Sequence, residues 1–234
     1  MATPAKDSIA VLPFVNMSGE PEQAVFTDGL TEDIITDLSN APGLFVIARN
    51  STLAYKGKPA DVRQIAHDLG VKYILEGSAR RSEKRLRINV QLSSAAEGGL
   101  HVWAERFDRQ LTDIFEVQDE IARRVVDAIR GKLGGQAVPE RYRPSNLEAY
   151  DLCVRSRDQW QISKSANDGA RLLLERAISL DPNYCEAHWL LANTLIFSWL
   201  VWGDAQQPNH RDALALARRA VELDPKDSAA RCST

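Results

Sequence analysis

The chain has 234 residues, of which 44% are hydrophobic and 26% are charged. This composition is typical of one large or two small globular domains, and the high apolar content excludes a disordered chain. The 29 basic and 32 acidic residues give a formal net charge of −3. Such a balance argues against binding to nucleic acid or to an anionic membrane through overall charge.

The sequence shows few targeting or redox signals. No basic segment followed by a long apolar segment opens the chain, so we expect no signal peptide and a cytoplasmic protein. The most apolar stretch, residues 189–203, is shorter than the roughly 20 residues of a membrane helix, so we predict a buried helix and no membrane span. The three cysteines, odd in number and widely spaced, are predicted to be reduced thiols: Cys153, Cys185 and Cys232.

Residues 1–135 form the predicted first domain, in which short apolar runs alternate with helical patterns. Continuous apolar runs predict buried strands, and apolar residues every three or four positions predict one face of a helix. In chain order we expect a strand at 8–14, a helix at 26–38, a strand at 44–48, a helix at 62–69 and a strand at 71–75. Asp61 is the expected N-cap of the second helix, and Gly70 is its expected C′ residue.

The clearest strand pattern lies at residues 85–92, where apolar and polar residues alternate. A turn at 82–84 joins this strand to the preceding one, and a glycine pair leads into a last strand at 100–107. A long amphipathic helix at 114–129, capped near Thr112, completes the order β-α-β-α-β-β-β-α. Crossover helices make part of such a sheet parallel, and hairpins make its end antiparallel, so we predict an α/β domain with a mixed sheet.

The second half of the chain has a different pattern. Residues 136–145 are rich in glycine and proline and form the predicted linker. No strand pattern follows it, but LERAISLDP at 174–182 is repeated as ARRAVELDP at 217–225, 43 residues later. Repeats of this size are typical of stacked helix pairs, so we predict an all-helical domain over residues 146–234.

This half resembles the tetratricopeptide-repeat family. That family places small residues and a large apolar residue at fixed distances before a terminal proline, because the two helices of a pair approach closely. These positions hold Ala170, Leu174, Ala177 and Pro182 in the first repeat and Ala213, Ala217, Ala220 and Pro225 in the second. The resemblance implies leading helices at 147–159 and 186–201, with two repeats and the start of a third at Ser228. Such stacks usually need about three repeats, so we expect an uncovered apolar end.

Residues 7–130 resemble a known bacterial domain. The resemblance rests on SIAVLPFVNMSGEPEQ, FTDGLTEDIITDLS, LFVIARNSTLAYKGK, VRQIAHDLGVKYILEGSARR and HVWAERFDRQLTDIFEVQDEI. Together these segments are similar to the domain between the catalytic domain and the tetratricopeptide repeats of bacterial class III adenylate/guanylate cyclases. That domain is itself similar to the amino-terminal domain of TolB, and it also follows winged-helix DNA-binding domains in some transcriptional regulators.

The resemblance implies a cytoplasmic, non-catalytic module that regulates or scaffolds a partner domain. A cyclase catalytic domain is about as large as this whole chain, so no sequence remains to encode one. No phosphate-binding glycine loop and no catalytic histidine or serine motif is present, and we expect no catalytic residue, cofactor or metal site. The expected partners are proteins, namely a cyclase or regulator domain, or a second copy at the open repeat end.

Two alternatives remain for the function. In the first, the chain is part of an adenylate/guanylate cyclase system and would be called a cyclase only because of its similarity to longer relatives. In the second, it is the accessory region of a winged-helix transcriptional regulator. Nucleic-acid binding by this chain itself is not favoured by its charge.

The best place for a small-molecule site is the carboxyl end of the predicted parallel strands, where α/β sheets gather ligands. Residues that follow or flank these strand ends are Arg49, Asn50, Ser51, Tyr55, Lys56, Glu76 and Ser78. The alternative is a polar loop that caps helices and turns.

Two charged clusters also have simpler explanations. Five basic residues surround one predicted hairpin: Arg80, Arg81, Lys84, Arg85 and Arg87. They either contact an anion or nucleic acid or discourage edge-to-edge strand pairing, and we favour the latter because no aromatic residues interleave to stack bases. Four acidic residues of the first helix are predicted to form a solvated face rather than a metal or acid/base site: Asp28, Glu32, Asp33 and Asp37.

The repeat region is unusually aromatic, with Trp160, Trp189, Trp199 and Trp202. We predict that these side chains fill the helix core. Trp199 or Trp202 is expected to line the concave groove in which such repeats hold peptide segments.

Overall fold

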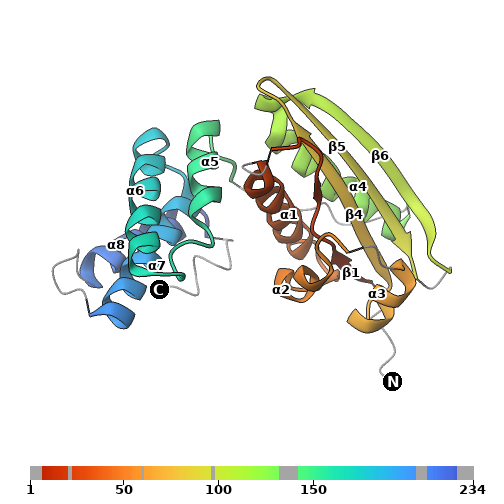
Figure 1. Cartoon of the computed structure of the whole chain (residues 1–234), viewed down its shortest axis with the longest axis horizontal. Helices are drawn as coiled ribbons and strands as arrows, with labels where there is room; N and C mark the ends of the chain where they lie inside the picture. Colours follow the sequence, from red (N-terminus) through yellow and green to blue (C-terminus); the bar gives the residue numbers. More distant parts are fainter. Residues whose placement is uncertain are drawn as a thin grey trace. The chain divides into compact units, whose positions relative to one another are not determined.

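A computed structural model describes residues 7–20, 23–58, 61–95, 98–131, 142–203 and 210–225. The chain divides into two compact units, Met1–Glu140 and Arg141–Thr234 (Figure 1). Most of the predicted linker and the predicted start of a third repeat lie outside the described residues. None of the described helices combines the length and the apolar character that crossing a membrane requires.

The first unit alternates strands and helices and then ends in antiparallel strands and a long helix. Its elements are β1 (Ser8–Val11), β2 (Val15–Asn16), α1 (Gln23–Ser39), β3 (Phe45–Val46), α2 (Arg49–Thr52), η1 (Leu53–Tyr55), α3 (Val62–Leu69), β4 (Tyr73–Arg81), β5 (Arg85–Ser94), β6 (Leu100–Gln110), η2 (Leu111–Asp113) and α4 (Ile114–Arg130). The predicted order is present, with the short β2, α2, η1 and η2 added to it.

The sheet has the strand order β3-β1-β4-β5-β6, and β2 pairs with β4. Strand β1 runs parallel to β3 and β4, whereas β4, β5 and β6 are antiparallel neighbours. The predicted α/β class with a mixed sheet is therefore confirmed. Helical crossovers impose the parallel half, and the tight turn between β4 and β5, where the Ser82 N–H donates to the Arg85 carbonyl at 2.8 Å, imposes the antiparallel half.

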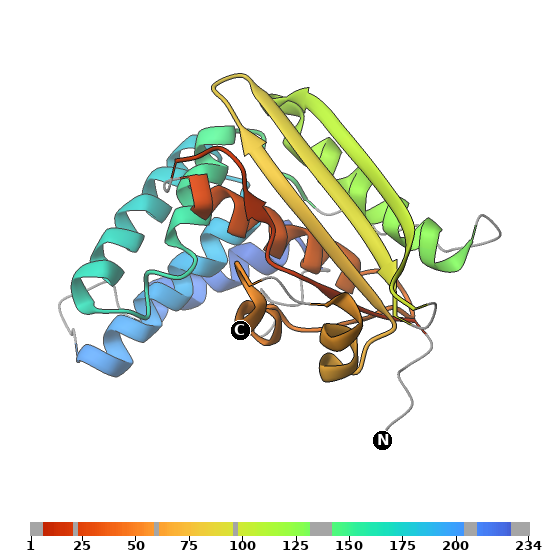
Figure 2. The ribbon, with the colours of Figure 1, turned by 45° about the vertical axis from the view of Figure 1, so that its right-hand side comes forward.

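The two faces of the sheet are covered differently. Helices α1 and α4 pack against each other and lie together along one face (Figure 2). On the other face, Ile65 and Ala66 of α3 form a buried cluster with Ala10 of β1 and Ile74 of β4. Helix α3 covers only part of this face, and Arg85, Arg87, Asn89 and Gln91 of β5, which point to the same face, are exposed or half-buried.

The capping signals were correct at α3, and the N-cap of α4 is one residue from Thr112, near which it was expected, but makes no side-chain cap bond. The Asp61 carboxylate accepts a hydrogen bond from the Arg63 N–H at 2.9 Å, and Gly70 ends the helix with a φ of 66°. Helix α4 is instead entered from the 3-10 turn η2, and its N-cap residue is Asp113 without a side-chain cap bond. The Thr112 hydroxyl donates to the Asp113 carboxylate at 2.9 Å.

The predicted buried strand at 44–48 is also wrong in extent. Only Phe45 and Val46 form β3, and the Phe45 side chain is 65% exposed. Strand β3 is the outer strand of the sheet, so an apolar run that suggests a central strand lies at an edge.

The predicted solvated acidic face of α1 is only half present. Asp33 and Asp37 are each 3% exposed, and the Gln118 amide of α4 donates to the Asp33 carboxylate at 2.9 Å. The side of α1 that carries them packs against α4, a helix that comes about 80 residues later in the chain. Asp28 and Glu32 remain partly exposed on the same helix.

The second unit consists of helices α5 (Leu147–Ser156), α6 (Lys164–Leu180), α7 (Cys185–Trp202) and α8 (His210–Leu223). Each helix packs against the next one in the chain. The small residues singled out by the sequence are buried where these helices meet, and each is at most 1% exposed: Ala170, Ala177, Ala213, Ala217 and Ala220. The α7–α8 connection lies mostly outside the described residues.

The aspartate of the first LDP motif ties the start of this unit to the α6–α7 turn. Asp181 is 3% exposed, and its carboxylate accepts hydrogen bonds from the Ser145 N–H at 2.7 Å and the Tyr142 hydroxyl at 3.3 Å. It also accepts one from the Asn183 N–H at 3.1 Å. The motif therefore has a structural role beyond ending a helix.

We expect ionisation of Tyr142 to lower the stability of this unit at high pH. Burial, together with the charge of Asp181 and the hydrogen bond to it, raises the pKa of the Tyr142 phenol to about 12. The folded state therefore favours the neutral phenol. The contribution of Tyr142 to the free energy of unfolding is complete below pH 10 and is lost as the pH rises through 12. We expect Tyr142→Phe to flatten this loss in melting curves recorded from pH 9 to 12, and parallel wild-type and variant curves would contradict the assignment.

Candidate functional site

The uncovered part of the sheet presents a polar surface, here called the open face. It consists of Glu76, Ser78 and Arg80 of β4, Arg85, Arg87, Asn89 and Gln91 of β5, and Ala104, Arg106 and Asp108 of β6. Side chains alternate between the two faces along each strand. The apolar residues of β5 point to α1 and α4, so the polar residues between them point to the opposite face.

A shallow hollow of about 580 Å³ lies on the open face between β4, β5 and β6. Its floor includes Glu76, Ser78 and Asn89, and the Asn89 amide donates to the Ser78 hydroxyl at 3.1 Å. Burial raises the pKa of the Glu76 carboxyl, and His101 opposes that rise. The hollow can therefore hydrogen-bond a polar ligand through a carboxyl, a hydroxyl and an amide on neighbouring strands.

The basic hairpin lies at the other end of the open face. Asp108 accepts from Arg85 at 2.8 Å and from Arg87 at 2.6 Å, and these hydrogen bonds lower the pKa of its carboxyl to about 2. Arg81 instead lies over the Phe26 ring, 4.7 Å from its centre. A second hollow of about 230 Å³ is lined by Arg80, Ser82, Arg85, Leu86, Arg87 and Asp108, while Lys84 is exposed in the turn.

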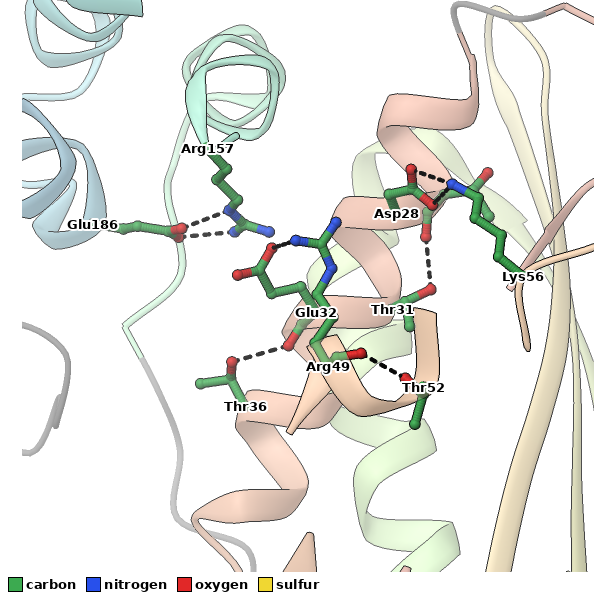
Figure 3. Close-up of polar contacts among 10 residues, drawn as sticks. Asp28, Thr31, Glu32, Thr36, Arg49, Thr52, Lys56, Arg157 and Glu186 are labelled. Atoms are coloured by element: carbon green, nitrogen blue, oxygen red, sulfur yellow. Dashed lines mark hydrogen bonds and ion pairs between the residues drawn. The ribbon is translucent and has the colours of Figure 1, made fainter. Parts of the chain in front are cut away.

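Two of the other predicted ligand residues, Arg49 and Lys56, form ion pairs with helix α1 (Figure 3). Lys56 Nζ lies 2.6 Å from the Asp28 carboxylate, and Arg49 Nη1 lies 3.6 Å from Glu32 Oε2. Arg49, Asn50 and Ser51 belong to helix α2 rather than to a loop. Tyr55 packs beside the apolar cluster between α3 and the sheet.

The structure therefore divides the predicted strand-end site into two places. Arg49 and Lys56 contact α1, whereas Glu76 and Ser78 lie within β4, opposite Gln91 and Asn89 of β5. Among the described residues, no group of three or more histidine, cysteine, aspartate or glutamate side chains is arranged to hold a metal ion.

The aromatic residues of the second unit form a cluster near the end of α7. Phe197 contacts Trp160 and Trp202 edge to face, at ring-centre distances of 5.1 and 5.2 Å. Beside this cluster, Trp199, Leu200 and Val201 are 51, 65 and 54% exposed. We call these three residues the α7 apolar patch. Trp202 thus belongs to the aromatic cluster, and Trp199 is the exposed tryptophan of the two that the sequence proposed.

Sequence reasoning missed four contributors to these surfaces. Asp108 and Arg106 lie on β6 in a segment of alternating charge, and their position could be inferred only from the register of β6 on β5. Leu200 and Val201 lie in an apolar run that continues around the whole of α7, and such a run predicts burial rather than exposure.

The fold is that of an α/β domain followed by an all-helical unit. Residues 5–124, more than half of the chain, match the family described as HilA/YgeH-like transcriptional regulator, second domain, and the chain belongs to this family. A curated relative from Rhizobium meliloti (strain 1021), named "Putative adenylate cyclase 3", is 50% identical over 225 residues. The match covers 94% of this chain but only 38% of that relative's length.

The first unit also has remote structural neighbours. TolB from Acinetobacter baumannii is 17% identical with a TM-score of 0.40, over 53% of this chain and 28% of that one. The lipoprotein GNA1162 from Neisseria meningitidis is 17% identical with a TM-score of 0.38, over 56% of this chain and all of that one.

Proposed function

We propose that this chain is a non-catalytic regulatory region that binds a partner protein. In this proposal the α/β domain, residues 1–135, docks on or senses a partner domain. A linker at 136–145 leads to tetratricopeptide repeats at 146–234. These repeats hold a peptide segment. The observation that carries the proposal is the α7 apolar patch, where three consecutive large apolar side chains are each more than half exposed. Large apolar side chains that are exposed together at the end of a helix offer a site for protein interaction.

The buried alanines support the tetratricopeptide assignment. A small residue at a helix crossing allows two backbones to approach closely, and Ala170 with Ala177 and Ala213 with Ala217 are such residues in the two successive pairs. The leading helices of these repeats, α5 and α7, line the concave groove, and the α7 apolar patch belongs to the second of them.

A nucleotide cyclase domain is the partner class that we favour. The Rhizobium meliloti relative is named as a cyclase, and the chain spans 38% of it, so the remaining 62% has room for a catalytic domain. The buried free thiols Cys153 and Cys185 support a cytoplasmic location, since reducing compartments keep such thiols unpaired.

Binding to the uncovered part of this relative tests the proposal. We expect the purified chain to bind that segment in calorimetric titrations, and Trp199→Ala to weaken binding by at least about tenfold, as for an exposed aromatic anchor. The matched control is Leu172→Ala on α6, because Leu172 is also apolar and 61% exposed. Equal effects of the two variants, or no binding at all, would refute this role.

The absence of catalysis has its own assay. The chain alone, incubated with ATP or GTP and with magnesium and manganese, is expected to form no cyclic nucleotide. Formation of cyclic product by the purified chain would overturn the non-catalytic assignment.

The family match favours a second candidate function, the accessory region of a transcriptional regulator. In that case the partner would be a DNA-binding domain, and the basic hairpin would make a weak contact with DNA. A salt-sensitive shift of duplex DNA by this chain would support the candidate, because phosphate contacts weaken as salt rises. No shift at low salt would remove the DNA contact.

A further inference from the structure

The open face carries an excess of positive charge at its hairpin end. Arg80, Arg85, Arg87 and Arg106 lie at this end with Asp108, and Glu76 and Glu105 line the hollow that Arg106 borders. Asp108 is already bound by Arg85 and Arg87. Within the described parts of the chain, Arg80 and Arg106 have no acidic partner, although both line hollows of the open face.

The register of the strands makes this charge unfavourable in the isolated unit. Arg80 of β4 lies directly opposite Arg87 of β5. Like charges directly opposite on neighbouring strands destabilise a sheet. An added anion would relieve this repulsion, so the surface is complementary to negative charge.

The shape of the surface favours an extended ligand. Arg106 of β6 is in register with Asn89 of β5 and Ser78 of β4. Arg80 lies on β4, two strands away from Arg106 and two residues beyond Ser78. The strand spacing and the rise per residue then separate their Cα atoms by about 12 Å. Alternate carboxylates of an extended peptide repeat roughly every 7 Å, so two or three of them span this distance.

The hollows lack the side chains that nucleic acids need for stacking. No phenylalanine, tyrosine or tryptophan is among the described residues that line either one. Single-stranded nucleic acid usually binds on aromatic platforms within a basic groove, so a basic surface without aromatic residues fits an acidic peptide better.

We propose that the open face binds an acidic, extended segment of a partner protein, with Arg80 and Arg106 as the anchoring cations and Ser78, Asn89 and Gln91 as hydrogen-bonding groups. This inference rests on the proposed protein-binding function and gives the α/β unit its own partner chemistry. The depressed pKa of Asp108 agrees with an electropositive surface.

The test uses a fluorescein-labelled peptide of five Glu-Ser repeats, whose glutamates all point to one side when it is extended. We expect the full chain to bind it at low salt, with an affinity that falls as salt rises. Arg80→Gln/Arg106→Gln is expected to weaken binding by about tenfold. Arg123→Gln is the matched control, because Arg123 is exposed on α4, the helix on the opposite face.

Three outcomes would overturn the proposal. These are no binding of the acidic peptide, an equal loss in the Arg123→Gln control, and tighter binding of duplex DNA or pyrophosphate than of the peptide. The helical unit provides an independent readout, since Trp199→Ala should leave peptide binding to the open face unchanged. Loss of the proposed peptide binding by the open face would therefore leave the proposed binding through the α7 apolar patch untouched. Failure of binding through the α7 apolar patch would likewise leave the open-face proposal untouched.

Discussion

Arg157→Met is expected to destabilise the second unit by about 3–5 kcal/mol, because it leaves a carboxylate without its partner in a nearly dry site. Arg157 Nε and Nη2 donate to the two oxygens of Glu186 at 2.7 and 3.0 Å. The two side chains are only 6 and 16% exposed. The pair joins the end of α5 to the start of α7 (Figure 3), so its loss weakens the contact between the two successive helix pairs.

A double-mutant cycle separates this coupling from simple loss of packing. We expect Arg157→Met/Glu186→Gln to recover much of the stability, since the glutamine still accepts the Tyr184 hydroxyl, which lies 3.2 Å from Glu186 Oε2. Urea unfolding can be followed by tryptophan fluorescence, because four of the five tryptophans lie in the second unit. Additive effects of the two changes would show that the pair is not coupled.

An exposed ion pair in the same unit is the matched control for this cycle. Arg176 Nη2 lies 3.8 Å from Glu148 Oε1, and both side chains are at least 60% exposed. Arg176→Met should cost less than about 1 kcal/mol, because exposed ion pairs contribute little.

Gly77→Ala is expected to destabilise the first unit by about 1–3 kcal/mol through overpacking. A Cβ atom on Gly77 would overlap Cε2 and Cζ of the Phe14 ring, and Phe14 is only 2% exposed. Gly77 lies opposite Val90, whose side chain is also buried, so neither the strand nor the ring can move away easily. Hydrogen exchange of the β4 and β5 amides, read by mass spectrometry, measures the loss.

Relief of the overlap provides the decisive comparison. Phe14→Leu/Gly77→Ala should be more stable than the sum of the two single changes predicts. The same substitution at Gly169 in α6 is the control, because a Cβ atom there would meet no neighbouring atom within 4 Å and helical glycine is unfavourable. Gly169→Ala should therefore stabilise its own unit by up to about 1 kcal/mol, and a similar loss at both glycines would refute the overpacking argument.

The accuracy of the sequence predictions follows how local each signal is. The alternation at 85–92 correctly placed the buried and exposed sides of β5, because a half-buried strand records both of its faces in its own residues. The N-cap at Asp61 and the left-handed Gly70 were also correct, since each depends on contacts within one turn. The edge position of β3 was not predictable, because an apolar run does not show how many neighbours its strand has.

The candidate sites depended on contacts across the chain. The pattern on α1 grouped four acidic residues, but Asp33 is bound to Gln118, which is 85 residues away, while Asp28 is bound to Lys56. In the basic hairpin, the sequence did not show which carboxylate pairs with Arg85 and Arg87. The register of β6 on β5 places Asp108 beside them.

The amino-acid sequence by itself determined the order of the main helices and strands, the α/β class of the first unit and the helical nature of the second, because periodicity and capping act over a few residues. Only the tertiary structure decided which charges are paired and which polar residues share a surface. Strand register and helix packing bring together residues that are far apart in the chain, and a one-residue shift in register would place each of them on the other face of the sheet.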